Sequence, residues 1–440
     1  MSFITHKSYL AVAIPFTIST VTQPLLGAVD TAVVGRLENA SYLGGVAIGT
    51  VIFNTLYWLF GFLRVSTSGF SAQSLGSDTQ DDSYYAFLRP FVMALFISMV
   101  FILFQYPIIK TAIHIYHPAP NVTRHAMTYF TILIWGAPFV LINYVSLGWL
   151  MGRKHIKESL FLQISTNFLN IILNILFVLI FKMEVAGVAW GSLISQCYDF
   201  GLGIFLISKK LDFTRFRRYR SGLLQGSAMK KLVGVNGDLL IRTLCLLIMT
   251  NMFVAKGSKM GASFLAANAV LFQIQYIIAY FFDGLANAGS VFVGKSVGEK
   301  NLKEFKRTVT ISNIHLVWLS LSVSVLLLLF QHPLIRCFTD LTEIVSLCNT
   351  YMIWLIIYPF IIGIGLVYYG FFTGATCTAP IRNSMIIALL VFITTYYTAV
   401  PVFHNHGLWL AFILFSLCRS GMLFFYRKKL IQARFLGNNY

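Results

Sequence analysis

Carboxylates are scarce in the apolar parts of this 440-residue chain, and Asp30 lies inside one of them, the run TVTQPLLGAVDTAVVG (20–35). Three other acids, Asp199, Asp238 and Asp283, also fall in or beside a stretch long enough to cross a membrane. A charged side chain at membrane depth costs at least about 2.5–3.5 kcal/mol, so it faces a cavity or a partner. The chemistry open to such a carboxylate is the binding and release of a proton or another cation.

Two of these acids have candidate basic partners in the sequence. Asp238 and Arg242 are spaced i,i+4, the spacing at which opposite charges on one helix pair, so we predict a structural ion pair. Asp199 comes shortly before a basic segment, and we expect a Lys or Arg of that segment as its partner. Asp30 has only Arg36 nearby, on another face of its helix. This isolation favours ion coupling as the role of Asp30.

The helix that carries Asp30 also combines a polar neighbour with two prolines. Gln23 precedes Asp30 by seven residues and shares its face. Pro15 and Pro24 each remove a backbone hydrogen bond, which allows a helix to bend. A protonatable side chain on a helix that bends could couple protonation to a change in shape.

The stretch QISTNFLNIILNILFVL (163–179) carries three amides, Asn167, Asn170 and Asn174. Asn170 and Asn174 lie on one helix face, and amides inside a bilayer must find hydrogen bonds. They could join neighbouring helices or line a polar pocket near Asp30, and the sequence leaves both open.

The composition is that of an integral membrane protein. Hydrophobic residues make up 57% and charged residues 11% of the chain, with a mean hydropathy of +0.76, against about 45–50% and 25% in soluble domains. We predict an all-α fold with twelve transmembrane helices, the first of them retained and not cleaved as a signal peptide. The apolar stretches lie near 8–34, 42–75, 84–113, 122–151, 159–180, 185–208, 229–255, 262–294, 308–330, 344–373, 381–403 and 407–426.

The charge distribution predicts the orientation of these helices. Lys and Arg number 33 against 15 Asp and Glu, and most fall on one side if the first segment is cytoplasmic and the rest alternate. This positive-inside pattern places both termini in the cytoplasm. The basic stretch 209–231 is then a topology signal and a contact for lipid headgroups, and no nucleic-acid partner is expected.

Sliding the sequence by 222 positions aligns its two halves. GRLENASYLGGVAIG (35–49) then lies over GSKMGASFLAANAVL (257–271), SLG (74–76) over SVG (296–298), and Gly148 and Gly152 over Gly370 and Gly374. We predict a six-helix lobe over 1–208, a basic cytoplasmic linker over 209–228 and a second six-helix lobe over 229–440. Because each half has an even number of helices, the repeat is parallel, a plan that secondary transporters use.

The sequence lacks the motifs of a membrane enzyme or an ATP-driven pump. It contains no HExxH, no Ser-His-Asp cluster and no GxxxxGK[ST] nucleotide cradle. The six cysteines are scattered without a CxxC pair, so we expect free thiols. We therefore predict no catalytic residue, cofactor or metal site, and a transporter driven by an ion gradient.

Several stretches together resemble the multidrug and toxic compound extrusion (MATE) family, most closely its branch named after the DNA-damage-inducible F protein. They are DTAVVGRL (30–37), LRVSTSGFSAQSLG (63–76), LGWLMG (147–152), the Asp238/Arg242 pair, FFDGLANA (281–288), GFFTGAT (370–376) and IRNSM (381–385). The resemblance covers essentially the whole chain. It implies a V-shaped, twelve-helix antiporter that exports organic cations and other amphipathic compounds in exchange for protons or sodium ions.

The resemblance also implies roles for single residues. Asp30 corresponds to the aspartate proposed to couple cation movement, and Pro15 to the proline at which the first helix is proposed to bend. Asp283, Asp238 and Arg242 are secondary candidates. The polar partners of Asp30 would be Gln23, Tyr129, Asn170, Asn174 and Ser192.

Departures from the family pattern bear on the ion. Asn174 stands where several relatives have a second aspartate, and Tyr369 and Ser290 replace acidic residues, which leaves Asp283 as the acid of the carboxy-terminal half. A single carboxylate at Asp30 can hold one proton, whereas sodium as a hard cation prefers several oxygen ligands. We therefore expect proton coupling, with sodium as the alternative.

The sequence thus predicts a monomeric, multi-pass, proton-coupled exporter of amphipathic small molecules in the bilayer of a bacterial inner membrane. The alternative is a flippase for lipids or lipid-linked oligosaccharides. An anionic pyrophosphate cargo would require several cationic side chains facing the cleft. Away from the ends of the predicted spans lie Arg64, Arg242 and Arg419, and Arg242 has a predicted partner.

Overall fold

The computed structural model describes residues 4–34, 40–77, 80–212 and 222–436, with side chains for all of these except 21–34, 40 and 80. Over these ranges the chain is helical and has no strand, which confirms the predicted all-α class. Nine segments of the described chain are long and apolar enough to cross a membrane. The exact number of twelve spans stays a prediction.

Two compact units divide the chain. One comprises Met1–Val21 with Gly234–Tyr440, and the other Thr22–Val233; we call them the carboxy-terminal and the amino-terminal unit. Helix α1 (His6–Val34) is therefore shared between them. The predicted lobes were 1–208 and 229–440, around a linker at 209–228. They differ from the two compact units in α1, because they assign the whole first helix to the amino-terminal half.

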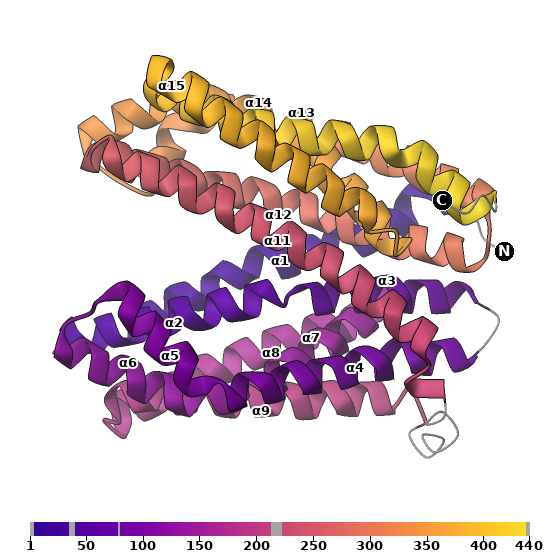
Figure 1. The fold of residues 1–440 in the computed structure, drawn as a ribbon, viewed down its shortest axis with the longest axis horizontal. Helices are drawn as coiled ribbons and strands as arrows, with labels where there is room; N and C mark the ends of the chain where they lie inside the picture. Colours follow the sequence, from indigo (N-terminus) through magenta and orange to yellow (C-terminus); the bar gives the residue numbers. More distant parts are fainter. Residues whose placement is uncertain (1–3, 35–39, 78–79, 213–221, 437–440) are drawn as a thin grey trace. The chain divides into compact units, whose positions relative to one another are not determined.

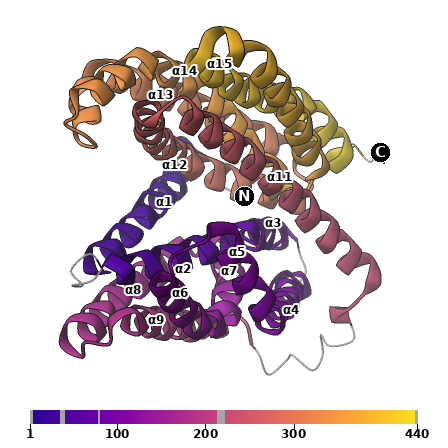
Figure 2. The ribbon, with the colours of Figure 1, turned by 60° about the vertical axis from the view of Figure 1, so that its left-hand side comes forward.

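Backbone carbonyls of α12 (Ala262–Gly298) hold the first half of α1. The Tyr9 hydroxyl donates to the carbonyl of Leu285 at 2.8 Å, and the Thr20 hydroxyl donates to the carbonyl of Tyr280 at 3.0 Å. Both views of the chain show this half of α1 running beside α12 (Figure 2). Hydrogen bonds to carbonyls satisfy polar groups that lipid cannot, so this part of α1 belongs to the carboxy-terminal unit.

In the amino-terminal unit, α7 packs against α3, α4 and α9, while α8 packs against α9 and α2 against α6 (Figure 1). The described helices after α1 are α2 (Ala40–Leu59), α3 (Phe62–Gly76), α4 (Gln80–Leu103), α5 (Gln105–Tyr116), α6 (Pro120–Leu133), the 3₁₀ turn η1 (Ile134–Gly136), α7 (Ala137–Gly152), α8 (Ile156–Ile175), the π-helical turn η2 (Leu176–Ile180) and α9 (Glu184–Ser208). Pro120 occupies the first turn of α6, where its missing N–H is no loss.

In the carboxy-terminal unit, α14 packs against α12, α13 and α15 (Figure 1). Besides α12, its helices are α11 (Gly226–Lys259), which belongs to this unit from Gly234 on, α13 (Leu302–Arg336), α14 (Thr342–Gly374) and α15 (Ala379–Phe435). The Asn301 side chain caps α13 by accepting from the Glu304 N–H at 3.0 Å.

Helix α15 covers the last two predicted spans and breaks between them at His404, whose φ of 48° is outside the helical region. Directly after the break, Asn405 and Asn268 of α12 exchange hydrogen bonds of 2.8 and 3.1 Å. The indole of Trp409 adds a third bond to Asn268 at 3.0 Å. These buried amides satisfy each other, so they fix where the chain turns back.

Glycines bring two helix backbones of the amino-terminal unit into direct contact. A Cβ added at Gly148 or Gly152 of α7 would lie closer than 3.0 Å to the carbonyl oxygen of Arg64 or Ser68 of α3. The two glycines are spaced i,i+4, the small-xxx-small pattern by which membrane helices approach closely. Only glycine fits at these two positions, because the facing atoms belong to backbone that cannot rotate away.

The carboxy-terminal unit repeats this contact. A Cβ added at Gly370 or Gly374 of α14 would lie closer than 3.0 Å to the carbonyl oxygen of Ala286 or Ser290 of α12. All four positions follow their counterparts in the amino-terminal unit by 222 residues, the shift at which the sequence aligns with itself. The internal repeat is therefore present in the packing of the helices as well as in the sequence.

Replacing Gly370 by Ala should destabilise the protein by about 1–3 kcal/mol, because the new methyl group overlaps the Ala286 carbonyl and forces the helices apart. The matched control is Gly421→Ala in α15, where an added Cβ meets nothing within 4 Å. Thermal unfolding in detergent measures both. Equal melting temperatures for the Gly370 variant and the wild type would show that the contact is not tight.

Candidate functional site

Three of the predicted site residues meet between α8 and α9. The Asn174 side-chain amide donates to the Asn170 carbonyl oxygen at 3.1 Å, and Asn170 donates to the Ser192 hydroxyl at 3.2 Å. Both asparagines are buried. Gly191 lets α9 approach here, since a Cβ at this position would overlap the Asn174 side chain. We call Asn170, Asn174 and Ser192 the amide cluster.

The remaining predicted residues of this site lie on α1 and α6. Tyr129 is buried on α6, with its ring packed edge to face on Phe53 of α2 at 6.2 Å. Pro15 lies within α1, which runs as one helix over His6–Val34. The side chains of Asp30 and Gln23 lie outside the described residues, so their contact with the amide cluster stays a prediction.

Asp238 pairs with a different arginine from the one predicted. Its carboxylate accepts from the Arg382 guanidinium at 2.8 Å and from the Thr378 hydroxyl at 2.7 Å. Arg242 instead lies over the ring of Tyr369, 4.3 Å from its centroid. The predicted Asp238–Arg242 pair is therefore wrong. An i,i+4 pair contributes only about 0.2–0.5 kcal/mol, and two directed bonds from Arg382 in α15 and from its N-cap residue Thr378, together with a cation–π contact, replace it.

Among the described residues, Asp199 also lacks its predicted basic partner. Its carboxylate accepts from the Thr166 hydroxyl of α8 at 2.9 Å and from the Asn143 side-chain amide of α7. Lys210, the second residue of the basic segment, pairs instead with Glu158 at 3.5 Å. No ion pair reaches Asp199 from the described part of the chain. Neutral donors on the neighbouring helices are closer to it than the cations at the end of α9.

The arginines within the spans lie in both units. Arg64 is on α3, while Arg242 and the buried Arg419 lie in the carboxy-terminal unit, close enough to each other to interact electrostatically. Asp283 of α12 also interacts with Arg419. The carboxy-terminal unit therefore contains two cations and one acid of the predicted set near one another.

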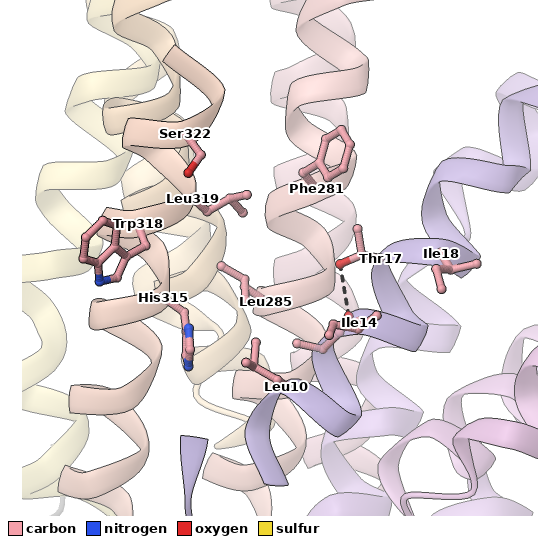
Figure 3. A pocket seen from close by; sticks show the side chains of 11 residues that line it. Leu10, Ile14, Thr17, Ile18, Phe281, Leu285, His315, Trp318, Leu319 and Ser322 are labelled. Carbon is pink, nitrogen blue, oxygen red and sulfur yellow. Dashed lines mark hydrogen bonds between the residues drawn. The ribbon is translucent and has the colours of Figure 1, made fainter. Parts of the chain in front are cut away.

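An apolar cavity of about 380 Å³ lies in the carboxy-terminal unit between the first half of α1, α12 and α13. Figure 3 shows its side chains converging from the three helices. Its polar members are Thr17, His315 and Ser322, and the exposed Trp318 forms one wall. Sequence reasoning missed this cavity because its lining residues are ordinary apolar helix residues that become neighbours only through packing. Its lining suits the apolar part of an amphipathic molecule.

Comparison with known proteins shows the family. The MatE family model matches residues 15–176 and 239–398, one segment in each half of the chain. The chain belongs to this family of membrane transporters, and the function class is transport and not enzymatic catalysis.

Individual relatives agree with this assignment. DNA damage-inducible protein F of Escherichia coli is 33% identical over 96% of this chain and 92% of its own length. Multidrug resistance protein MdtK of Photorhabdus laumondii is 22% identical over 96% of this chain and 94% of its own. The match at this length and identity supports a multi-pass transporter of the MATE family along the whole chain.

Solved structures share the fold. A transporter of the MOP superfamily from Pyrococcus furiosus, whose binding pocket is described as having reverse polarity, superposes with a TM-score of 0.85 at 17% identity, covering 99% of this chain and 97% of that one. A mutant of the MATE transporter VcmN from Vibrio cholerae gives 0.84 at 16% identity, covering 97% of both chains. These similarities support the MATE fold.

Double-mutant cycles with alanine can show whether Arg382 or Arg242 is the partner of Asp238. We expect a coupling energy of about 0.5–1 kcal/mol between Asp238 and Arg382, reduced by partial exposure, and a value near zero between Asp238 and Arg242. Thermal or denaturant unfolding of the single and double variants in detergent provides the energies. The reverse order of the two couplings would contradict the contacts described here.

Proposed function

We propose that this transporter exports organic cations and other amphipathic drugs in exchange for protons, with Asp30 as the coupling residue. The observation that supports it most directly is the amide cluster, which gathers three of the predicted partners of Asp30 on one helix interface. Relatives described as multidrug resistance and multidrug and toxin extrusion proteins support drugs as the cargo class. The protein would act as a monomer in a bacterial inner membrane.

The proposed cycle follows from the charge of Asp30. When the site opens outward, a proton from the medium neutralises the carboxylate. The neutral acid no longer attracts a cationic cargo, and it exchanges hydrogen bonds with Gln23, Asn170 and Asn174 differently from the carboxylate. Helix α1 then bends at Pro15 and the cargo is expelled; inward opening returns the proton to the cytoplasm.

The apolar cavity beside Trp318 is a candidate place for the cargo's ring system. Indole and phenyl faces attract cations, and they also pack against planar apolar groups. Trp318 and Phe281 provide such surfaces on α13 and α12. Cargo with a flat aromatic cation, of the ethidium type, therefore suits the transporter better than a highly polar sugar.

A lipid or lipid-linked oligosaccharide flippase is the second candidate. The observation that favours it is the proximity of Arg242 and Arg419 in the carboxy-terminal unit, since Arg242 does not pair with Asp238. Two guanidinium groups could receive one phosphate. Movement of a fluorescent phospholipid between leaflets of the same proteoliposomes would favour this candidate, and cation transport without lipid movement would favour the exporter.

Replacing Asp30 by Asn should abolish proton-driven export, because the amide has nearly the shape of the neutral acid and cannot bind or release a proton. Proteoliposomes with an imposed pH gradient and an ethidium-type substrate measure it, with sodium gradients tested separately. Asp283→Asn is the matched control, for which we expect a smaller effect. Uphill transport by the Asp30 variant under a pH gradient would refute the proposed coupling.

The proposed orientation has both termini and residues 209–228 in the cytoplasm and 256–262 outside. Single cysteines at Arg218 and Gly257, in a background without the six native cysteines, should react with an impermeant thiol reagent from opposite sides of the membrane. The Lys and Arg asymmetry is the reason for this expectation. Labelling of both from the same side would overturn the orientation and the parallel repeat.

A further inference from the structure

Asp199 lies in a second polar site of the amino-terminal unit, built from three helices. Its two acceptor bonds come from Thr166 of α8 and Asn143 of α7. The site lies about two and a half turns before the end of α9 at Ser208. The family resemblance assigned no role to Asp199, and no described residue of the basic segment makes an ion pair with it.

A row of polar side chains on one face of α8 runs from this site to the amide cluster. Asn174, Asn170 and Thr166 follow one another at i,i+4 spacing and so lie along one face of α8. That face contacts Ser192 and Asp199, which are seven residues apart on α9. The row spans about 12 Å along the helix axis. Asp199 is therefore the first carboxylate met along this face when one moves from the amide cluster toward the side at which α8 begins and α9 ends.

The hydroxyl of Thr166 allows Asp199 to be satisfied with or without a proton. The Thr166 oxygen lies 2.8 Å from the Leu162 carbonyl and 2.9 Å from an oxygen of Asp199, but a hydroxyl has only one proton to donate. It donates to Asp199 when the carboxylate is ionised. When Asp199 carries a proton, Asp199 donates to Thr166 and Thr166 donates to Leu162.

Asn143 provides a second, independent indication that a ligand enters this site. Its amide nitrogen donates to Asp199, whereas its carbonyl oxygen is buried without a hydrogen-bond partner, and the residue is only 7% exposed. An unpaired buried acceptor is unfavourable. A water molecule would satisfy it, and so would a protonated Asp199 that donates to Asn143 instead of Thr166 after rotation of the amide.

No countercharge within the described residues neutralises Asp199. Glu158 pairs with Lys210 and His155, and Glu184 accepts from Tyr42. Burial and the nearby Lys210 lower the pKa of His155. The other titratable or charged groups on the helices that pack against α9 are Tyr57, Arg124, His125, Tyr129, Tyr144 and Lys157, and none of them makes an ion pair or hydrogen bond with Asp199.

We infer that Asp199 is a second proton-binding residue of this unit, through which the proton released by Asp30 passes on its way to the side at which α9 ends. The inference rests on the proposed proton coupling at Asp30. In the transfer, Asp30 loses the proton and becomes a carboxylate, while the Asp199 carboxylate gains it. Thr166 then turns its hydroxyl from Asp199 to Leu162, so neither state leaves an unpaired group on α8.

Replacing Asp199 by Asn tests the inference, because the amide keeps the hydrogen bonds but binds no proton. Export driven by a pH gradient should fall by about 10²-fold, the lower range for a positioned proton-transfer group. Substrate counterflow at equal pH, which requires no net proton release, and the melting temperature should stay near the wild-type values. If the variant does not fold, Asp199→Glu, which retains a carboxyl group, should export at an intermediate rate.

Infrared difference spectra over a pH titration provide the direct readout. The carbonyl band of protonated Asp199 should disappear in Asp199→Asn, while that of Asp30 remains, and it should shift in Thr166→Val. The matched control is Ser165→Ala, since Ser165 donates only to Leu162, at 3.1 Å; there the band should be unchanged.

The outcomes separate the two proposals. Wild-type export with a normal pH profile in Asp199→Asn, alongside its loss in Asp30→Asn, overturns the inference and leaves the proposed function standing. A wild-type protein that ignores pH gradients overturns the proposed function. In that case a titrating carboxyl band from Asp199 still supports the site, and its absence refutes it.

Discussion

The close approach of glycine-bearing helices to backbone carbonyls sets the distances on which the other polar contacts depend. Helices in a bilayer gain little from the hydrophobic effect when they associate, so dense packing between backbones has to hold them. Gly148 and Gly152 do this for α7 against α3, and Gly370 and Gly374 do it for α14 against α12. Gly191 acts in the same way at the amide cluster, where a larger residue would displace Asn174.

Once the helices are this close, polar side chains are satisfied mostly by neutral neighbours on the next helix. Asn268 and Asn405 bond each other, and Gln275 donates to the Tyr358 hydroxyl at 2.7 Å. Asp199 follows the same rule, whereas Asp238 is paired with an arginine. The difference matters for function, because a carboxylate held by a guanidinium stays ionised and one held by hydroxyl and amide groups can change its charge.

The sequence was sufficient for the all-α class of fold and for the internal repeat, since these follow from long apolar runs and a self-match. It also identified Asn170 and Asn174, whose spacing places them on one face. It did not predict the partners of Asp238 and Asp199, because neighbours along the sequence reveal only partners on the same or the adjoining segment. Arg382 is 144 residues from Asp238, and Thr166 is 33 residues from Asp199, so tertiary packing decides both.

The first helix illustrates the same limit. Its apolar run is continuous, and nothing in the composition marks Val21 as the end of one compact unit and Thr22 as the start of the other. Tyr9 and Thr20 attach the helix to carbonyls of α12, and carbonyls leave no signal in a sequence. Pro15, which the family resemblance connects with bending, falls inside the part that belongs to the carboxy-terminal unit.

The repeated glycine contact also has an evolutionary consequence. On the facing helices the contact is made by the carbonyls of Arg64 and Ser68 in one half and of Ala286 and Ser290 in the other. Every amino acid has a carbonyl, so these facing positions could diverge after duplication while the glycines could not. The amino-terminal half now has the guanidinium of Arg64 where the carboxy-terminal half has the methyl group of Ala286. The two halves were therefore free to acquire different side-chain chemistry on the same backbone arrangement.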